Sequence, residues 1–186
     1  MRMTQSGSQT VGPFFNFALT TNPALGILAR DGAEGERIRL TLRLLDGDGL
    51  PTPADALIEL WQADAQGRYA HPLDPRGGEA DPNFCSFGRL ETDMNGTCSF
   101  VTVRPGSVSD QAPHISVAVF ARGLLRQLYT RIYFEGEVLN ADDPVLALVP
   151  DDRCSTLLAR RVEGEANSWF LEIRLQGEGE TVFFEV

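Results

Sequence analysis

The segment from Arg37 to Leu44 alternates polar and apolar residues without a break. Successive side chains of a β-strand point to opposite faces, so a period of two predicts a strand with one buried face and one face in water. The segment 56–61 is mostly apolar, which is typical of a more central strand. These two patterns indicate a protein built on β-sheet.

Further strands and sharp turns follow along the chain. Asp, Asn and Gly cluster between the strand patterns and predict tight turns at 46–49, 93–96 and 176–179. Helix signals are short, at 144–148 with Asp143 as N-cap and at 155–161. Many short strands with regular turns predict an all-β fold, a single-domain β-sandwich with few short helices. The other predicted strands are 97–103, 114–120, 127–134, 169–175 and 181–186.

The first thirty residues lack clear periodicity. We expect residues 1–30 to form an extended N-terminal arm that packs on something else, and residues 31–186 to form the sandwich. The chain has 186 residues, of which 42% are hydrophobic, which suits one domain with a real core. No apolar stretch approaches the roughly 20 residues that span a bilayer.

Charge and cysteine usage restrict the partners and the compartment. The net charge of −10 predicts that the chain binds neither nucleic acid nor an anionic membrane surface. It does not exclude a small anionic substrate, because one well-placed arginine can dominate locally. The three cysteines form no C-x-x-C pair, and the first residues lack an apolar signal core. We therefore expect a cytoplasmic protein with reduced cysteines.

His114 and Ser116 lie two positions apart at the start of a predicted strand, so their side chains share one face. Two histidines at this spacing could both reach one metal ion, but a serine hydroxyl is a poor substitute for imidazole. No set of three or four plausible metal ligands converges in the sequence. A single histidine at a strand start is also commonly structural.

Arg122 follows the apolar run 119–121, where its planar guanidinium could match a carboxylate. The alternative is a salt bridge to an acidic neighbour. In the segment 8–15, Gly12 allows close backbone approach and Pro13 fixes the chain direction. This segment either contacts a ligand or anchors the arm through its phenylalanines.

These motifs together resemble those of the intradiol ring-cleavage dioxygenases, and the resemblance runs through nearly the whole chain. The run 173–184 and the Phe-Ala-Arg-Gly segment at 120–123 are similar to the alpha subunit of an enzyme built from alpha and beta chains. The other matching segments are Ser8-Gln9-Thr10-Val11-Gly12-Pro13, Leu60-Trp61-Gln62-Ala63-Asp64, Asp81-Pro82-Asn83-Phe84, Arg104-Pro105-Gly106 and Ala112-Pro113-His114-Ile115-Ser116.

The resemblance implies an activity for the assembled enzyme. Such an enzyme opens protocatechuate between its two hydroxylated carbons with O2, giving 3-carboxy-cis,cis-muconate in the β-ketoadipate pathway. The beta subunit holds the Fe(3+) with two tyrosines and two histidines, and αβ protomers build a larger hetero-oligomer. The resemblance implies that this chain alone is inactive and contains no catalytic residue.

The resemblance also assigns roles to single positions. Where the beta subunit has ligands, this chain has Val108 and Ser116, so His114 is vestigial and no metal is expected here. The second tyrosine has no counterpart in the loop 74–81. Four residues are implied to line or approach the substrate pocket beside the iron of the beta subunit: Thr10, Gly12, Pro13 and Arg122.

Two other interpretations stay open at this point. The chain could be a self-sufficient intradiol dioxygenase, although a full set of two tyrosines and two histidines is missing. It could also be a non-enzymatic β-sandwich binding module, and only the family resemblance argues strongly against that.

Overall fold

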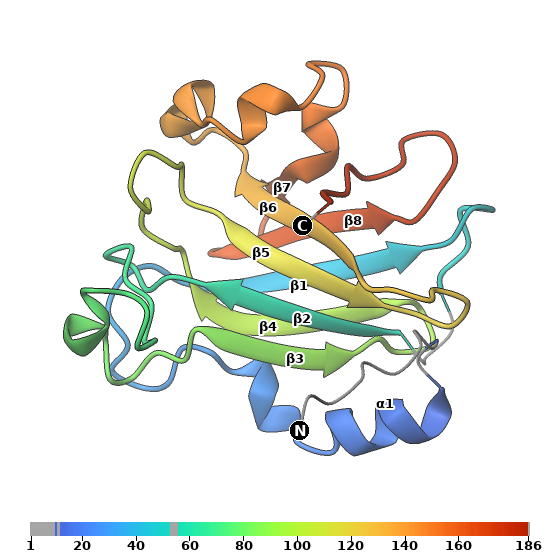
Figure 1. Ribbon diagram of the computed structural model, residues 1–186, viewed down its shortest axis with the longest axis horizontal. Helices are drawn as coiled ribbons and strands as arrows, with labels where there is room; N and C mark the ends of the chain where they lie inside the picture. The colour runs from blue at the N-terminus through green and yellow to red at the C-terminus, as the bar shows by residue number, and fades with distance from the viewer. Residues whose placement is uncertain (1–9, 11, 53–55, 186) are drawn as a thin grey trace, which may run out of the picture.

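The computed structural model describes residues 10, 12–52 and 56–185 (Figure 1). Among them, eight strands form a sheet in the order β3-β2-β5-β6-β7-β8-β1-β4. Neighbouring strands are antiparallel except for the pairs β1–β8 and β6–β7. The strands are β1 (Arg37–Leu45), β2 (Leu57–Gln62), β3 (Phe87–Glu91), β4 (Thr97–Val103), β5 (Ile115–Phe120), β6 (Leu128–Phe134), β7 (Leu158–Arg161) and β8 (Ser168–Arg174).

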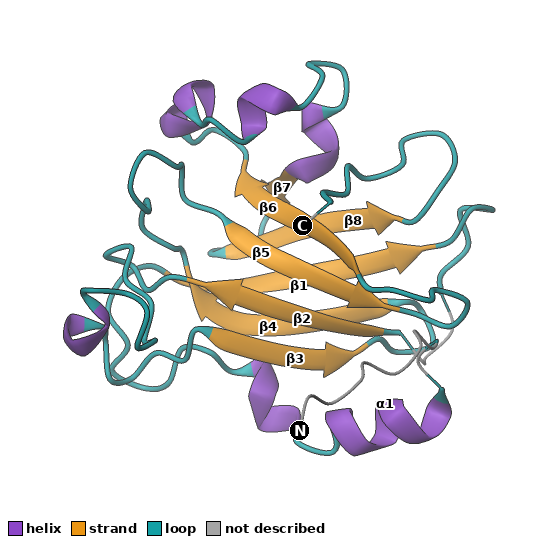
Figure 2. Ribbon diagram, in the orientation of Figure 1, coloured by secondary structure: helices purple, strands orange, loops and turns teal. Residues whose placement is uncertain are grey.

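The sheet folds over on itself into two layers. Figure 2 shows β2, β3, β5 and β6 crossing in front of β1, β4 and β8. The two ends of the strand order, β3 and β4, approach each other, so the sheet is nearly closed. The prediction of an all-β sandwich with few short helices is therefore confirmed.

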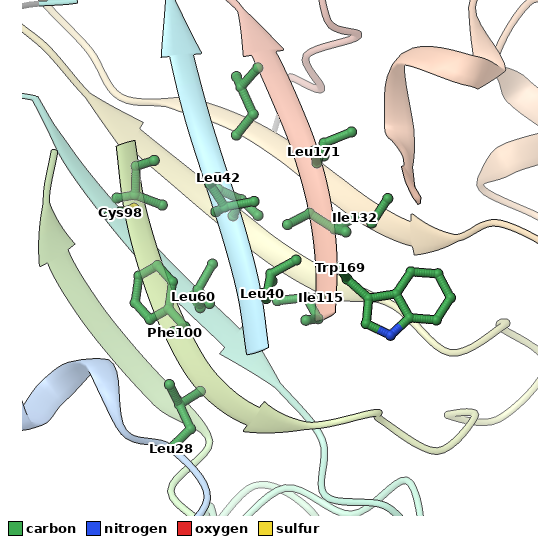
Figure 3. Close-up of a cluster of buried hydrophobic side chains, with 14 of the residues drawn as sticks. Leu28, Leu40, Leu42, Leu60, Cys98, Phe100, Ile115, Ile132, Trp169 and Leu171 are labelled. Atoms are coloured by element: carbon green, nitrogen blue, oxygen red, sulfur yellow. The ribbon is translucent and has the colours of Figure 1, made fainter. Parts of the chain in front are cut away.

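The core lies between the two layers and follows from the alternation of polar and apolar residues in the segment 37–44. In β1, Ile38, Leu40, Leu42 and Leu44 are fully or almost fully buried, while the residues between them face outward. Figure 3 shows Leu40 and Leu42 of the back layer facing side chains of the front layer. The front layer contributes Leu60, Ile115 and Ile132, and Phe100 and Trp169 complete the cluster.

The helical elements are short and lie outside the sheet. The described part of the N-terminal arm is not extended throughout, because α1 spans Pro13–Thr20 and packs near β3. With only two helical turns, α1 is too short for its sequence to show a clear helical period, although Pro13 occupies a position that favours a helix start. No helix of the described residues is long and apolar enough to cross a membrane. The 3-10 turns are Pro23–Gly26, Gly77–Glu79, Val138–Asp142, Leu146–Leu148 and Cys154–Leu157.

Three sequence-based expectations differ from the structure. The edge strand β3 was not predicted, because Gly88 interrupts its apolar pattern. The predicted helix 155–161 is wrong, since a 3-10 turn leads directly into strand β7 there. Residues 181–185 form an isolated bridge, Tyr129 with Phe184, in place of a full strand. Residues 1–9 and 11 of the expected arm, and residue 186, lie outside the described residues.

Gln62, at the end of β2, ties the two layers together in the core. Its side-chain nitrogen Nε2 donates to the carbonyl oxygens of Val103, at 3.0 Å, and Ala63, at 3.1 Å. Its Oε1 accepts a hydrogen bond from the Thr102 hydroxyl at 2.7 Å. Gln62 and Thr102 are completely buried, and water cannot replace a lost partner there without rearrangement. This amide therefore fixes the end of β2 against the end of β4.

Replacing Gln62 with leucine should lower the free energy of unfolding by about 2–3 kcal/mol, because buried partners lose their hydrogen bonds at similar side-chain volume. Urea denaturation followed by circular dichroism measures the change. The control is Gln66→Leu, since Gln66 is exposed and its side-chain amide donates to the Glu34 carboxylate at the surface. Equal midpoints for Gln62→Leu and wild type would contradict the role of Gln62.

Candidate functional site

An aromatic hollow of about 540 Å³ lies beside one end of β2 and β5, on the outer side of the front layer. The Trp61 and Tyr69 rings are parallel, with centroids 5.6 Å apart, and His71 meets Trp61 edge-on at 5.8 Å. Val108 and Ser109 also line the hollow. The hollow offers stacking surfaces, but the Val108 side chain has no donor atom for a metal.

The loop that contains Gly67 packs closely against the segment that contains Ser107, next to this hollow. Gly67 has a positive φ of +74°, and a Cβ there would collide with the backbone of Ser107. The buried Asp64 carboxylate accepts hydrogen bonds from the backbone N–H groups of Gln66, at 2.9 Å, and Asp81, at 3.1 Å. Glycine and aspartate therefore hold the loop carrying Tyr69 against the segment that leads to Val108.

His114 and Ser116 share the outer side of the front layer, as the strand period predicts. The His114 ring is buried, and its Nδ1 donates to the Ala112 carbonyl oxygen at 2.8 Å. Burial lowers the pKa of His114 below its usual value, so the imidazole stays neutral at pH 7. Ser116 is partly buried and lies directly opposite Arg131 in the β5–β6 pairing.

Arg131 is the residue of this region that sequence reasoning missed. Its Nη1 donates to Gln111 Oε1 at 2.8 Å and lies 3.4 Å from the Tyr133 hydroxyl. Burial raises the pKa of Tyr133 to about 12 and also raises that of Tyr69, and the positive charge of Arg131 opposes both shifts. The sequence does indicate that residues 129, 131 and 133 share one face of a strand. It does not indicate which residue Arg131 faces, because that pairing depends on the β5–β6 register.

Asp143 is a buried acceptor beneath these residues. Its carboxylate accepts hydrogen bonds from the backbone N–H groups of Ala112, Val145 and Leu146, at 2.7 to 2.9 Å, and from the Tyr133 hydroxyl at 3.0 Å. Burial raises its pKa, but these four donors outweigh burial and hold the pKa below the usual 3.8. The predicted helix 144–148 with Asp143 as N-cap is wrong, because the 3-10 turn there spans only Leu146–Leu148 and has Val145 as its N-cap.

The residues of this region do not fit a ferric ion. In the part of the chain that the structure describes, no group of three or more His, Cys, Asp or Glu side chains could hold a metal. Tyrosinate oxygen also binds ferric iron, but valine at 108 offers no ligand atom and the Ser116 hydroxyl is a weak one. The cationic Arg131 opposite Ser116 opposes a further positive charge.

Thr10 contacts the backbone on either side of Arg122, just past the other end of β5. The Thr10 hydroxyl accepts a hydrogen bond from the Gly123 N–H at 2.8 Å and donates to the Ala121 carbonyl at 3.4 Å. These two contacts flank Arg122, whose side chain is exposed. Gly123 adopts a φ of +91°, a conformation that favours glycine and lets its N–H turn toward Thr10.

Gly12 and Pro13 follow Thr10 at the start of α1. Gly12 is the N-cap residue of this helix, with an extended backbone and no side-chain cap, and Pro13 is its first residue. A Cβ added to Gly12 would meet no atom of the described residues within 4 Å, so packing against them does not require glycine here. The structure thus brings the arm and Arg122 to one end of β5.

The two ends of β5 are separate regions. β5 ends at Phe120, so four of the six steps from Ser116 to Arg122 follow strand geometry, and these span about 13 Å at roughly 3.3 Å per residue. Thr10 and Arg122 therefore lie toward the opposite end of β5 from His114 and Ser116.

The class of protein follows from this fold and its relatives. A family model described as dioxygenase matches residues 11–177. The structure of an intradiol ring-cleavage dioxygenase from Tetranychus urticae superposes with a TM-score of 0.64 at 19% identity, covering 80% of this chain and 84% of that one, which shows a shared fold. The chain belongs to the intradiol dioxygenase family, and the resemblance seen in its motifs is confirmed.

Three relatives of the chain are alpha or beta chains of protocatechuate 3,4-dioxygenase. The chain is 39% identical to the protocatechuate 3,4-dioxygenase alpha chain of Burkholderia cepacia, over 98% of both chains. It is 38% identical to the alpha chain of Pseudomonas putida, over 97% of this chain and 96% of that one. The beta chain of Burkholderia cepacia is 35% identical, over 79% of this chain and 67% of that one.

Replacing Asp143 with asparagine should lower the free energy of unfolding at pH 7 by about 2–3 kcal/mol, because charge-assisted hydrogen bonds are lost and an amide NH2 faces N–H donors. Asp142→Asn, an exposed neighbour with the same change of charge, is the control. Because the pKa of Asp143 is lowered on folding, the contribution of its carboxylate is complete above pH 3.8 and is lost as the pH falls through the lowered pKa. Urea titrations at several pH values test this, and equal stability of the two variants at pH 7 would refute it.

Proposed function

We propose that this chain is the alpha, non-iron-binding subunit of a protocatechuate 3,4-dioxygenase. With a beta subunit it forms αβ protomers of a hetero-oligomer that cleaves protocatechuate with O2 to 3-carboxy-cis,cis-muconate, a step of the β-ketoadipate pathway. The near full-length similarity to two alpha chains, and the weaker similarity to a beta chain, support this assignment. The Fe(3+) belongs to the beta subunit in this proposal.

The observation that carries the proposal is the joining of Thr10 to the residues on either side of Arg122. This cluster lies beyond the end of β5 that is opposite Ser116, about 13 Å of strand away from it. An exposed arginine next to an arm is instead suited to complete a site on another chain. Gly12 supports the same role, because no described residue fills the space beside it and a partner or ligand could approach its backbone closely.

Each residue of the cluster has a distinct role in the proposed pocket. Arg122 offers a planar fork that matches the carboxylate of a small aromatic acid. Thr10 fixes the backbone on either side of Arg122, and Gly12 and Pro13 line the pocket wall. The ring-opening chemistry takes place at the iron of the beta subunit, so this chain supplies no catalytic residue and is inactive alone.

The remaining parts of the proposal concern partners and location. Residues 1–30 act as the arm that contacts the beta subunit, and residues 31–186 form the sandwich. The three cysteines are unpaired, which supports a reducing, cytoplasmic location. The net charge of −10 supports a role without nucleic acid or membrane partners.

In the assembled enzyme, Arg122→Ala should lower kcat/KM for protocatechuate by roughly 10- to 150-fold, because a charge-assisted hydrogen bond worth about 1.5–3 kcal/mol is lost. The iron content should stay at the wild-type level. Steady-state kinetics on purified, iron-replete complexes measure the effect. Arg122→Lys should recover only part of the loss, since lysine keeps the charge but lacks the planar fork.

The matched control is Arg126→Ala, which removes an exposed arginine from the same β5–β6 connection. It should leave kcat/KM near the wild-type value. Wild-type constants for Arg122→Ala would remove Arg122 from the substrate pocket. A loss of assembly with unchanged constants in the surviving complex would make it a structural residue.

Purified without its partner, the full-length chain should contain no stoichiometric iron and should be colourless, because positions 108 and 116 carry no iron ligands of the required kind. Elemental analysis and visible spectroscopy test this. A burgundy protein with a tyrosinate-to-iron absorption band would overturn the assignment of the iron to the beta subunit.

A further inference from the structure

We propose that a hollow on the outer side of the back layer binds a small organic acid that carries a carboxylate at each end. The hollow lies between β7, β8 and the loop 176–179, and it measures about 490 Å³, a size typical of small-molecule sites. None of its lining residues belongs to the aromatic hollow or to the cluster around Arg122. Its ligand is therefore inferred from its own side chains, independently of the proposed function.

Strand alternation places the polar side chains of this hollow on the outer side. The odd-numbered residues of β8 are buried in the core, so Phe170, Glu172 and Arg174 point outward. β7 adds Leu158 and Arg160, and Arg160 lies directly opposite Phe170 in the antiparallel β7–β8 pairing. Charged groups and apolar surface thus line one hollow.

Two guanidinium groups lie toward opposite ends of the hollow. Arg160 is level with Phe170, and Arg174 lies four residues farther along β8, which is about 13 Å of strand at roughly 3.3 Å per residue. The side chains of Phe170 and Leu158 also line the hollow and supply apolar surface. An extended molecule with an apolar middle and two anionic ends matches this order of groups, because each arginine can pair with one carboxylate.

The two arginines differ in how they are engaged within the chain. Arg160 is exposed, and its guanidinium makes no hydrogen bond or ion pair with any residue that the structure describes. The Nη2 of Arg174 donates to the Glu172 carboxylate at 2.9 Å, and Arg43, the β1 partner of Glu172, lies 4.0 Å from the same carboxylate. A ligand carboxylate can therefore pair with Arg160 directly, whereas at the other end it competes with Glu172.

The charges of this face favour an anion, although the whole chain carries a net charge of −10. Arg39 adds an exposed guanidinium on the outer side of β1, and Glu178 lines the hollow from an exposed loop. A local excess of positive charge attracts small anions, and salt screens acidic groups more than about 10 Å away. The excess arises from Arg39, Arg43, Arg160 and Arg174 against Glu172 and Glu178.

An acidic segment of another chain would carry the same charge as such a ligand. A concave hollow with apolar surface suits a small molecule better, because it can enclose most of the surface of the ligand. The ring-opened product in the proposed function has carboxylates at both ends of its chain and belongs to this ligand class.

The test is isothermal titration calorimetry of trans,trans-muconate into the assembled enzyme at neutral pH. Muconate has a rigid carbon chain with a carboxylate at each end. Sorbate is the matched control ligand, since it has the same chain with a methyl group in place of one carboxylate. If the chain does not assemble with a beta subunit, the same titrations use the full-length chain alone.

Arg160→Ala should raise the Kd for muconate about 10-fold, the effect of one charge-assisted hydrogen bond at an exposed position. Glu172→Gln should lower the Kd a few-fold, because Arg174 and Arg43 then lose their competing carboxylate. Sorbate should bind about 10-fold more weakly than muconate. Arg126→Ala, which removes an exposed arginine from the β5–β6 connection, should leave the Kd unchanged.

Three results would overturn the proposal. A wild-type Kd for Arg160→Ala would show that muconate binds elsewhere, such as in the pocket beside the iron of the beta subunit. Equal affinities for sorbate and muconate, or no measurable binding to the wild-type protein, would also contradict it. Loss of assembly in Arg160→Ala, seen by size-exclusion chromatography, would make this face a contact between chains. Absence of dioxygenase activity would instead contradict the proposed function and leave these titrations unchanged.

Discussion

The position of β5 between β2 and β6 is the constraint on which the rest of the structure depends. Because both neighbours are antiparallel and hydrogen-bonded to it, β5 can neither shift its register nor turn its faces without breaking two ladders. Its start carries His114 and Ser116, and its end leads into Arg122. One strand therefore separates a region that resembles a lost metal site from a region suited to a partner's pocket.

The first of these regions is stabilised by hydrogen bonds and opposite charges among its own side chains. Arg131 and Asp143 supply opposite charges, and the Tyr133 hydroxyl lies between them. Buried polar groups are costly unless they are paired, so a chain that lacks metal ligands must satisfy the remaining groups otherwise. The Asp143 carboxylate does this and also holds the backbone of Ala112, just before His114.

Sequence patterns predicted most of the sheet because alternation along a strand is a local property. They missed β3, where Gly88 interrupts the pattern, and misassigned 155–161, where four strand residues follow a single 3-10 turn. In the candidate site, Arg122 was singled out for its own chemistry, and Thr10 through the family resemblance. Arg131 was not, because its importance depends on which residue of β5 it faces.

The sequence by itself determined the strand faces and the family resemblance, because these are properties of residues near one another in the chain. Only the tertiary structure decided which distant residues meet. Thr10 reaches the residues beside Arg122 across 111 sequence positions, and Arg131 faces Ser116 across a hairpin. Such contacts depend on the register of paired strands and on the path of the arm, and local sequence preferences do not encode either one.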